Sequence, residues 1–281
     1  GKERLARQRF PDEKLWIRQK RDRLNREKGT YGDQMSDKIT LTGMVLSALP
    51  VGEYDKRIVL LTKERGKISG FAKGARRQNS PMMAAANPFC YGTFECFEGR
   101  TSYNIYQAQI DQYFEKLSLD FENAYYGMYF LEFADYYARE NNDEKELLKL
   151  LYVTLKALEH GRVNRKLIRY IYELRAMVIN GEYPESFSCV NCGSSEGLMG
   201  YSDEKNGVIC QNCFPHMRGK RLMESTIYAM QYVTAAPLEK LYTFLLTPEV
   251  EREFCSMQER FRKKLIDRDF KTLEILNTLQ I

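Results

Sequence analysis

Residues 57–73, RIVLLTKERGKISGFAK, decide the fold at the front of the chain. Residues 57–62 form a short apolar run bounded by charged residues, a pattern typical of a buried β-strand. Residues 63–67 indicate a hairpin turn, with Gly66 at the position that requires a positive φ. The strand pattern then resumes over residues 68–73. The sequence therefore predicts a β-hairpin that carries basic residues along its length.

Further strand-like segments flank this hairpin. Apolar residues alternate with polar ones over residues 39–45, 89–97 and 103–110. Such alternation is typical of strands that bury one face. Five short strands with no intervening helix predict a small closed barrel of the OB type, although periodicity alone leaves an SH3-like barrel open.

After Lys116 the apolar period changes to 3.6, which indicates helices. The pattern predicts them over residues 120–140, 142–159, 164–180, 224–236 and 238–246, and from beyond Pro248 to about residue 279. The predicted fold class is therefore α+β: an N-terminal OB-type β-barrel followed by an α-helical domain with an inserted four-cysteine zinc module. The expected boundaries are 35–114 for the barrel, 115–187 and 217–281 for the two parts of the helical domain, and 188–216 for a zinc-ribbon-like module.

The inserted module contains two Cys-x-x-Cys pairs, Cys189/Cys192 and Cys210/Cys213, separated by seventeen residues. Each pair presents two thiolates on one tight turn, and two such turns close a tetrahedral site on one ion, which we expect to be Zn²⁺. Two disulfides are the alternative, which fits poorly because the start of the chain lacks the apolar region of a secretory signal. Four thiolates leave no open coordination position, so we expect the zinc to be structural.

Positive charge is concentrated at the front of the chain. Residues 35–80 contain nine Lys and Arg against four Asp and Glu, whereas residues 81–281 contain 23 against 28. Eight basic residues fall within 22 positions of the hairpin and the loop after it, with Glu64 as the sole acid among them. They are Lys56, Arg57, Lys63, Arg65, Lys67, Lys73, Arg76 and Arg77. On a barrel we expect them to converge on one face and bind a phosphate backbone; a solvated, charged hairpin is the alternative.

Residues 1–34 differ in composition from the rest of the chain. They contain eleven Lys and Arg against six Asp and Glu, and the one Trp of the chain, Trp16. We expect a basic extension that is disordered or a lone helix outside the domain, or one not native to it because an upstream start was assigned in place of Met35. A basic arm that adds nucleic-acid affinity is the alternative.

Features of an enzyme are scarce in the sequence. It has two histidines, His160 and His216, and no Gly-rich phosphate loop, G-x-S-x-G or HExxH motif. No apolar run of about eighteen residues exists, so we expect no membrane span and a cytoplasmic location. A zinc-dependent nuclease or deaminase would need an open metal site with a general base nearby, which the sequence does not contain. An RNA-binding zinc-ribbon protein is a second alternative.

From Met35 onward the chain resembles the bacterial DNA repair protein RecO family. The resemblance rests on residues 54–62 (YDKRIVLLT), residues 71–77 (FAKGARR), the helix ending at Arg175, the cysteine pairs and the closing residues 270–273 (FKTL). It implies an OB barrel, a helical domain and a zinc module, and it places on the family's DNA-contacting barrel face the residues Lys56, Arg57, Lys67, Lys73, Arg76 and Arg77. Residues 1–34 lie outside it.

The resemblance also implies a function without catalysis. A protein of this family is expected to bind single- and double-stranded DNA and to anneal complementary strands coated by single-strand binding protein. With RecR it is expected to load the recombinase RecA at gaps. We therefore expect a cytoplasmic, nucleoid-associated protein that has neither a membrane partner nor a small-molecule substrate.

Overall fold

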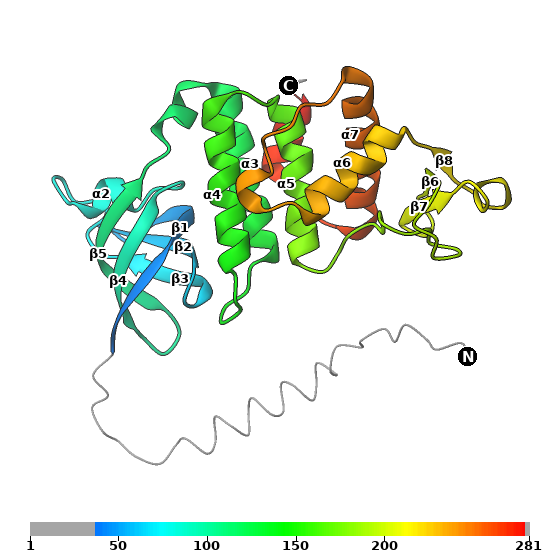
Figure 1. Ribbon diagram of the computed structural model, residues 1–281. Coiled ribbons are helices and arrows are strands. Elements are labelled where there is room, and N and C mark those ends of the chain that lie inside the picture. The colour runs from blue at the N-terminus through cyan, green and yellow to red at the C-terminus, as the bar shows by residue number, and fades with distance from the viewer. Residues whose placement is uncertain (1–36, 279–281) are drawn as a thin grey trace, which may run out of the picture. The chain divides into compact units, whose positions relative to one another are not determined.

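A computed structural model describes residues 37–278 of the chain (Figure 1). The expectations for residues 1–34 therefore lie outside the described residues. Among residues 37–278 no helix is long and apolar enough to cross a membrane.

Five strands form a closed barrel at the start of the described chain. They are β1 (Lys38–Val51), β2 (Asp55–Thr62), β3 (Gly66–Ala72), β4 (Tyr91–Glu98) and β5 (Tyr103–Gln112), in the order β1-β2-β3-β5-β4. All pairs are antiparallel except β3 with β5, and β1 closes the barrel against β4. A short helix, α2 (Met82–Ala85), lies between β3 and β4. This strand order resolves the choice that periodicity left open in favour of the OB type.

The barrel strands have two kinds of buried residue. Inward-pointing side chains such as Ile58, Leu60 and Phe94 fill the barrel interior. Met44 and Leu61 face each other on the outside of β1 and β2, yet they are fully buried because they belong to the core of the helical domain. The barrel and the helices therefore share one continuous apolar interface along these two strands.

The helical domain is built from α3 (Phe121–Tyr137), α4 (Lys145–His160), α5 (Arg165–Ile179), α6 (Glu224–Ala235), α7 (Pro248–Leu265) and α8 (Lys271–Thr278), with a 3₁₀ turn, η1 (Glu115–Leu119), ahead of them. Asp120 and Asn164 cap α3 and α5 by accepting hydrogen bonds from the amides of Asn123 and Lys166. Gly161 ends α4 with a φ of 64°. These local signals lie where the sequence predicted the first three helices.

The prediction of a helix over residues 238–246 was wrong. This segment contains only a 3₁₀ turn, η3 (Leu238–Lys240), followed by irregular backbone. Pro248 does not break a helix but opens α7, and the Thr247 hydroxyl accepts a hydrogen bond from the Val250 amide at 3.5 Å. Proline suits this place because amides in the first turn of a helix have no partner within the helix. The last predicted helix is also interrupted, since α7 ends at Leu265 and α8 begins at Lys271.

The tip of the β2–β3 hairpin is joined to the α3–α4 loop by backbone hydrogen bonds. The Lys67 amide donates to the Arg139 carbonyl at 3.0 Å, and the Asn141 amide donates to the Arg65 carbonyl at 2.8 Å. Gly66, between them, has a φ of 63°, and a Cβ there would lie 2.2 Å from the Arg139 carbonyl oxygen. Glycine is required at this position both by conformation and by space. The hairpin tip therefore fixes the barrel to the helical domain.

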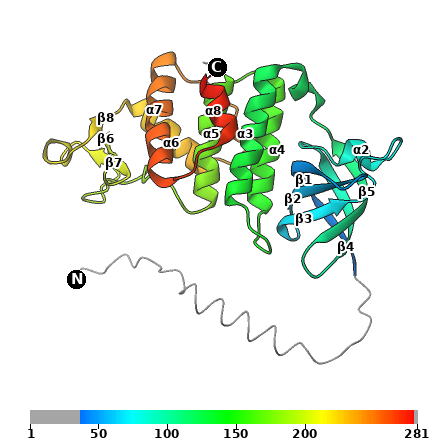
Figure 2. The ribbon, with the colours of Figure 1, turned by 180° about the vertical axis from the view of Figure 1, so that it is seen from behind.

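The cysteine module leaves the helical domain after α5 and returns to it at α6. It contains β6 (Leu198–Ser202), β7 (Gly207–Cys210), a 3₁₀ turn η2 (Phe214–His216) and β8 (Lys220–Arg221), with the strand order β7-β6-β8. The sheet thus continues beyond residue 216, because Lys220 and Arg221 pair with β6. Arg260 on α7 donates to Asp203 at 3.0 Å and holds the module against the helices. The module and the barrel lie on opposite sides of the helices (Figures 1 and 2).

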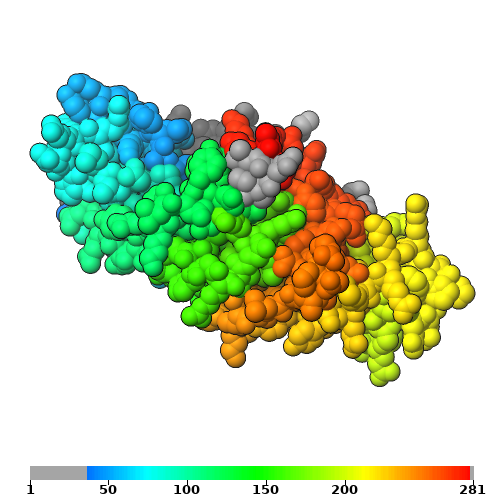
Figure 3. Space-filling view, turned by 90° about the horizontal axis from the view of Figure 1, so that it is seen from above, coloured from blue at the N-terminus to red at the C-terminus, as the bar shows by residue number. Residues whose placement is uncertain are grey.

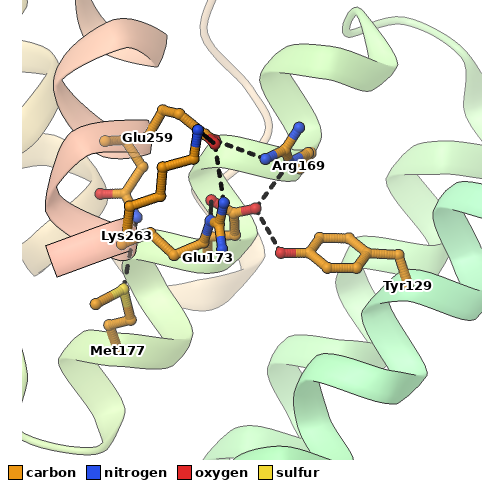
Figure 4. Close-up of polar contacts among 8 residues, drawn as sticks. Tyr129, Arg169, Glu173, Met177, Glu259 and Lys263 are labelled. Atoms are coloured by element: carbon orange, nitrogen blue, oxygen red, sulfur yellow. Dashed lines mark hydrogen bonds and ion pairs between the residues drawn. The ribbon is translucent and has the colours of Figure 1, made fainter. Parts of the chain in front are cut away.

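Charged side chains are buried between α3, α5 and α7 (Figure 4). Glu173 is fully buried, and its Oε1 accepts hydrogen bonds from Arg169 Nε at 2.7 Å and from the Tyr129 hydroxyl at 2.6 Å. Arg169 also donates to Glu259 at 2.7 Å, and Arg262 donates to Glu259 at 2.8 Å. The two buried arginines and two glutamates of this group, the Glu173 network, balance in charge, and the exposed Lys263 lies 3.2 Å from Glu259 at its edge.

Candidate nucleic-acid interface and metal centre

The eight basic residues that the sequence singled out do not form one cluster. Lys56 lies at the start of β2 and Lys63 follows its end. Seven residue steps of a strand span about 23 Å at about 3.3 Å per residue. Three residues therefore lie at the hairpin tip, and we call them the tip group: Lys63, Arg65 and Lys67. The other five lie at the far end of the hairpin and in the loop after β3, and we call them the loop group: Lys56, Arg57, Lys73, Arg76 and Arg77.

Two members of the tip group make contacts within the protein. Lys67 donates from its Nζ to the Asp135 carbonyl at 2.6 Å and to its carboxylate at 3.1 Å, which ties β3 to α3. Arg65 lies 3.4 Å from Glu98 at the end of β4. Lys63 is exposed. Lys67 therefore joins the barrel to α3, and Arg65 joins the hairpin tip to β4 within the barrel.

The loop group surrounds the place where two connections meet. The Arg76 amide donates to the Tyr54 carbonyl at 2.8 Å, and its guanidinium donates to the Gly52 carbonyl at 3.0 Å. The Arg77 guanidinium lies 5.1 Å from the centre of the Tyr54 ring, within reach of a cation–π contact. These contacts hold the β1–β2 connection and the loop after β3 together, while Arg76, Arg77 and Tyr54 stay exposed to solvent.

Asp55 connects the start of β2 to the loop after β3. The Gly74 amide donates to its Oδ1 at 2.9 Å, and Lys73 Nζ lies 2.9 Å from its Oδ2. The backbone hydrogen bond from Gly74, and then the hydrogen bond from Lys73, lower the pKa of the Asp55 carboxyl. Asp55 is the acid in direct contact with the loop group, and about half of the Lys73 side chain remains exposed beside it.

Lys56 and Arg57 have different surroundings although they are adjacent in sequence. Lys56 is half-buried and donates to Asn87 Oδ1 at 2.6 Å, which holds the segment after α2; burial lowers the pKa of its ammonium. Arg57 is exposed on the outside of the barrel, where it pairs across the strands with Phe71 on one side and Leu49 on the other. Leu49 is 65% exposed, so this row presents apolar surface next to a guanidinium.

The four predicted metal ligands meet in the module between β6, β7 and the two cysteine turns. Their sulfur atoms all lie within 4.8 Å of one another, and the Cys192 and Cys210 sulfurs are 3.6 Å apart. Four thiolates about 2.3 Å from a tetrahedral ion would be spaced by about 3.8 Å. The first turn folds back at Gly193, which has a φ of 77° and donates its amide to the Cys189 carbonyl at 2.8 Å. The cysteines are thus placed to hold a metal ion.

The protonation of these thiols also favours a cation. Burial by itself raises the pKa of Cys189, but hydrogen bonds from the backbone amides of Cys210, Cys192 and Asn191 outweigh it and lower the pKa to about 6. A hydrogen bond from Asn191 lowers the pKa of Cys213, but burial and the three other cysteine side chains outweigh that effect and raise it to about 11. Thiols crowded into one site cannot all lose their protons unless a positive ion balances them.

Comparison with known families adds to this geometry. A model described as Recombination protein O N terminal matches residues 35–114, which contain the barrel. A model described as Recombination protein O C terminal matches residues 118–274, more than half of the chain. The chain belongs to the RecO family. The resemblance drawn from the sequence is thereby confirmed, and the OB barrel and the cysteine module are placed within that family.

Several RecO relatives align with this chain over two thirds or more of their length. The protein of Alkaliphilus metalliredigens is 30% identical over 240 residues, which are 84% of this chain and 98% of the relative. That of Acetivibrio thermocellus is 27% identical over 85% of this chain and 96% of the relative. That of Bacillus pumilus is 34% identical over 61% of this chain and 67% of the relative. Each of these is named DNA repair protein RecO.

The structure of this RecO family member adds residues to the candidate interface that the sequence did not indicate. Tyr54 lies in a connection outside the alternating pattern, and only the loop after β3 brings Arg77 onto its ring. Leu49 continues a strand beyond the segment in which alternation was evident, and the register places it beside Arg57. In the sequence, Leu49 was an apolar residue a few positions before a predicted basic residue. The strand register was needed to show that it lies exposed beside Arg57.

Proposed function

We propose that this chain binds single- and double-stranded DNA through the loop group of its barrel and anneals complementary strands. The observation that carries the proposal is the meeting of two connections at one corner of an OB barrel. There, exposed Arg76 and Arg77 flank the exposed ring of Tyr54, with Lys73 and Arg57 nearby. Guanidinium groups suit phosphate oxygens, and aromatic rings suit unstacked bases.

Within this proposal the eight basic residues have unequal roles. Arg57, Lys73, Arg76 and Arg77 would contact phosphates directly, because their charged ends are exposed at one corner. Lys56, Arg65 and Lys67 support the barrel through Asn87, Glu98 and Asp135, so their effect on DNA would be mainly indirect. Lys63 would add a distant contact for a longer strand.

The annealing mechanism that we propose requires no catalysis. Two DNA strands repel each other through their phosphates, and the loop group would neutralise part of that charge where the strands meet. The strands are then held close enough for a few base pairs to form. Base pairing supplies the free energy and the sequence selection of the remaining steps, so neither a nucleotide nor an active site is required.

The proposal includes the partners and the metal that membership in the family suggests. The chain would act on strands coated by single-strand binding protein and, with RecR, help to load recombinase at gaps in the nucleoid. One Zn²⁺ held by the four cysteines would stabilise the module as a structural ion. In such a protein the barrel would comprise residues 35–114, the zinc module 188–216, and the helical domain the segments 115–187 and 217–281.

The experiment is an annealing assay with complementary strands coated by single-strand binding protein, with and without RecR. In Arg76→Ala with Arg77→Ala we expect slower annealing and weaker binding to single-stranded DNA. The slope of log K against log salt should fall by about 1.4, at about 0.7 per lost phosphate contact. The matched control, Arg162→Ala with Lys166→Ala, removes two exposed cations of the helical domain and should leave both properties unchanged.

A conservative variant separates charge from folding of the loops. Arg76→Lys with Arg77→Lys keeps both charges and should retain most of the salt slope. Melting temperatures should show that each variant is folded. If the alanine variant anneals and responds to salt as the unaltered protein does, the loop group is not the DNA surface and the proposal is wrong.

A further inference from the structure

The cysteine module carries a second basic surface, distinct from the loop group. His216, Arg218, Lys220 and Arg221 fall within six positions, and all four are exposed. No Asp or Glu occurs in the nineteen residues between Glu204 and Glu224. This concentration stands out because residues 81–281 as a whole contain more acids than bases.

The cations of this run are not used within the protein. In the part of the chain that the structure describes, the side chains of Arg218, Lys220 and Arg221 make no ion pair and donate no hydrogen bond. The acids on neighbouring elements already have partners: Asp203 accepts from Arg260 at 3.0 Å, and Glu253 accepts from the Met223 amide at 2.8 Å. The positive charge of the run is therefore available to a partner.

The run is held on a rigid frame. Lys220 and Arg221 pair with Tyr201 and Gly200 in the sheet of the module. A Cβ at Gly219 would lie 2.6 Å from the Ile209 side chain, and one at Gly200 would lie 2.4 Å from the Phe214 ring. Close packing just before β8 and on its partner strand β6 fixes the backbone from which these cations project. Long side chains on a fixed backbone lose less entropy on binding than those of a mobile loop.

Neutralisation of the metal site is an alternative use of these charges, since four thiolates around one Zn²⁺ carry a net charge of −2. The contacts argue against it. Asn191 donates to the Cys213 sulfur at 3.2 Å. None of the basic side chains of the run, within the described residues, donates to a cysteine sulfur. The basic side chains of the run therefore do not serve to neutralise the metal site.

We propose that Arg218, Lys220 and Arg221 form a second DNA contact on the metal module, which binds the phosphate backbone. The proposal rests on the proposed function of the barrel and extends it. The module and the barrel lie on opposite sides of the helices (Figure 3), so one chain would touch DNA at two separate places. Duplex DNA has a negative charge about every 1.7 Å of its axis, so two cations on β8 and one just before it can meet several phosphates. Such a contact would keep a second strand, or a second part of the same one, close to the barrel.

An acidic protein segment is the other partner that a basic surface could bind. Among the strands of residues 37–278, β8 lies at the edge of its sheet, because the strand order is β7-β6-β8. However, β8 has two residues, and Leu222 directly after it is buried. An added peptide strand would find few backbone groups to pair with, since strands usually have three residues or more. The phosphate backbone, which needs charge rather than an edge, is the better match.

The experiment uses the zinc-loaded full chain and fluorescence anisotropy with a labelled single-stranded oligonucleotide at several salt concentrations. Lys220→Ala with Arg221→Ala is compared with the control Arg162→Ala and Lys166→Ala, which removes the same charge elsewhere. We expect the salt slope of the module variant to fall by about 1.4 and its affinity to weaken, with the control unchanged. Combined with Arg76→Ala and Arg77→Ala, the two losses should add, because the sites do not share contacts.

Each other outcome has a defined meaning. An unchanged slope in the module variant, together with a reduced slope in the barrel variant, overturns this proposal and leaves the function of the barrel standing. Unchanged slopes in both variants overturn both. If the module variant keeps its salt slope but loses binding to poly-glutamate, the surface is a protein contact and the proposal is wrong. A fall in zinc content in the folded variant would assign the charges to the metal site and would also refute it.

Discussion

Replacement of Glu173 by glutamine is expected to destabilise the helical domain strongly. Glu173 is fully buried and accepts hydrogen bonds from Arg169 at 2.7 Å and from Tyr129 at 2.6 Å, and its other oxygen lies 3.6 Å from Arg262 Nε. A glutamine that keeps its oxygen toward Arg169 must direct its NH₂ group toward Arg262, so two donors would face each other. The variant also leaves two buried arginines with Glu259 as their one carboxylate partner in the network.

The expected loss can be worked out from these contacts. Both hydrogen bonds then go to a neutral instead of a charged oxygen, which costs about 1–1.5 kcal/mol each, and the buried NH₂ group that faces Arg262 without an acceptor costs about 1–3 kcal/mol more. Removal of one partner from a buried ion pair costs about 3–5 kcal/mol, which agrees. We therefore expect the free energy of unfolding to fall by about 3–5 kcal/mol. With a urea m-value of about 3 kcal/mol/M, the midpoint would shift by about 1–1.7 M.

The assay is urea unfolding followed by circular dichroism at the helix signal, with tyrosine absorbance as a second probe near Tyr129. The control is Arg252→Gln, which removes a cation from an exposed pair with Glu249 and should leave the midpoint unchanged. Arg169→Met combined with Glu173→Leu and Arg262→Met should lose less stability than Glu173→Gln alone, because no unpaired arginine is left in the core. A loss below about 1 kcal/mol in Glu173→Gln would refute the view that this network depends on its buried charge.

Two further predictions concern the hairpin tip and the metal site. Gly66→Ala should destabilise the chain by more than about 2 kcal/mol and speed amide exchange at Lys67. The reason is that positive φ costs about 1–2 kcal/mol and the added Cβ would meet the Arg139 carbonyl. In the control Gly52→Ala, where φ is 57° and nothing lies within 4 Å, the loss should be confined to backbone strain. Cys210→Ser should remove stoichiometric zinc, measured by atomic emission, and lower the melting temperature, whereas retained zinc with unchanged melting would contradict the four-cysteine site.

Local patterns in the sequence were sufficient for the elements that depend on near neighbours. Residues 57–62 and 66–72 form the predicted hairpin, with Gly66 at positive φ. The helices α3, α4 and α5 lie where the 3.6-residue period placed them; α4 buries one apolar face, whereas α5 is buried on all sides over residues 167–174. The spacing of the cysteine pairs predicted one compact site, and their sulfurs do lie together, since two residues between cysteines allow a tight turn with both thiols on one side.

The same local patterns failed where the backbone conformation depended on a residue's place within a helix or on its packing against the core. Pro248 was expected to break a helix, but in the first turn of α7 its missing amide has no cost. The segment 238–246 has an apolar pattern like that of a helix, yet Leu238 and Leu241 are buried against the core from a 3₁₀ turn and the residue directly after it. Periodicity records which residues become buried, and several backbone conformations can bury the same side chains.

The order of residues alone was enough to specify the hairpin of the barrel, the helical period, the four-cysteine site and the excess of basic residues between positions 56 and 77. The division of those charges into two groups came from contacts made on folding. Lys67 and Arg65 face Asp135 and Glu98, residues that are distant in sequence, so their charge is used in the fold. Arg76 and Arg77 instead meet Tyr54 and remain exposed. Whether a basic side chain supports the fold or is available to a partner depends on which acid the folded chain brings near it, and that pairing is not encoded in local sequence.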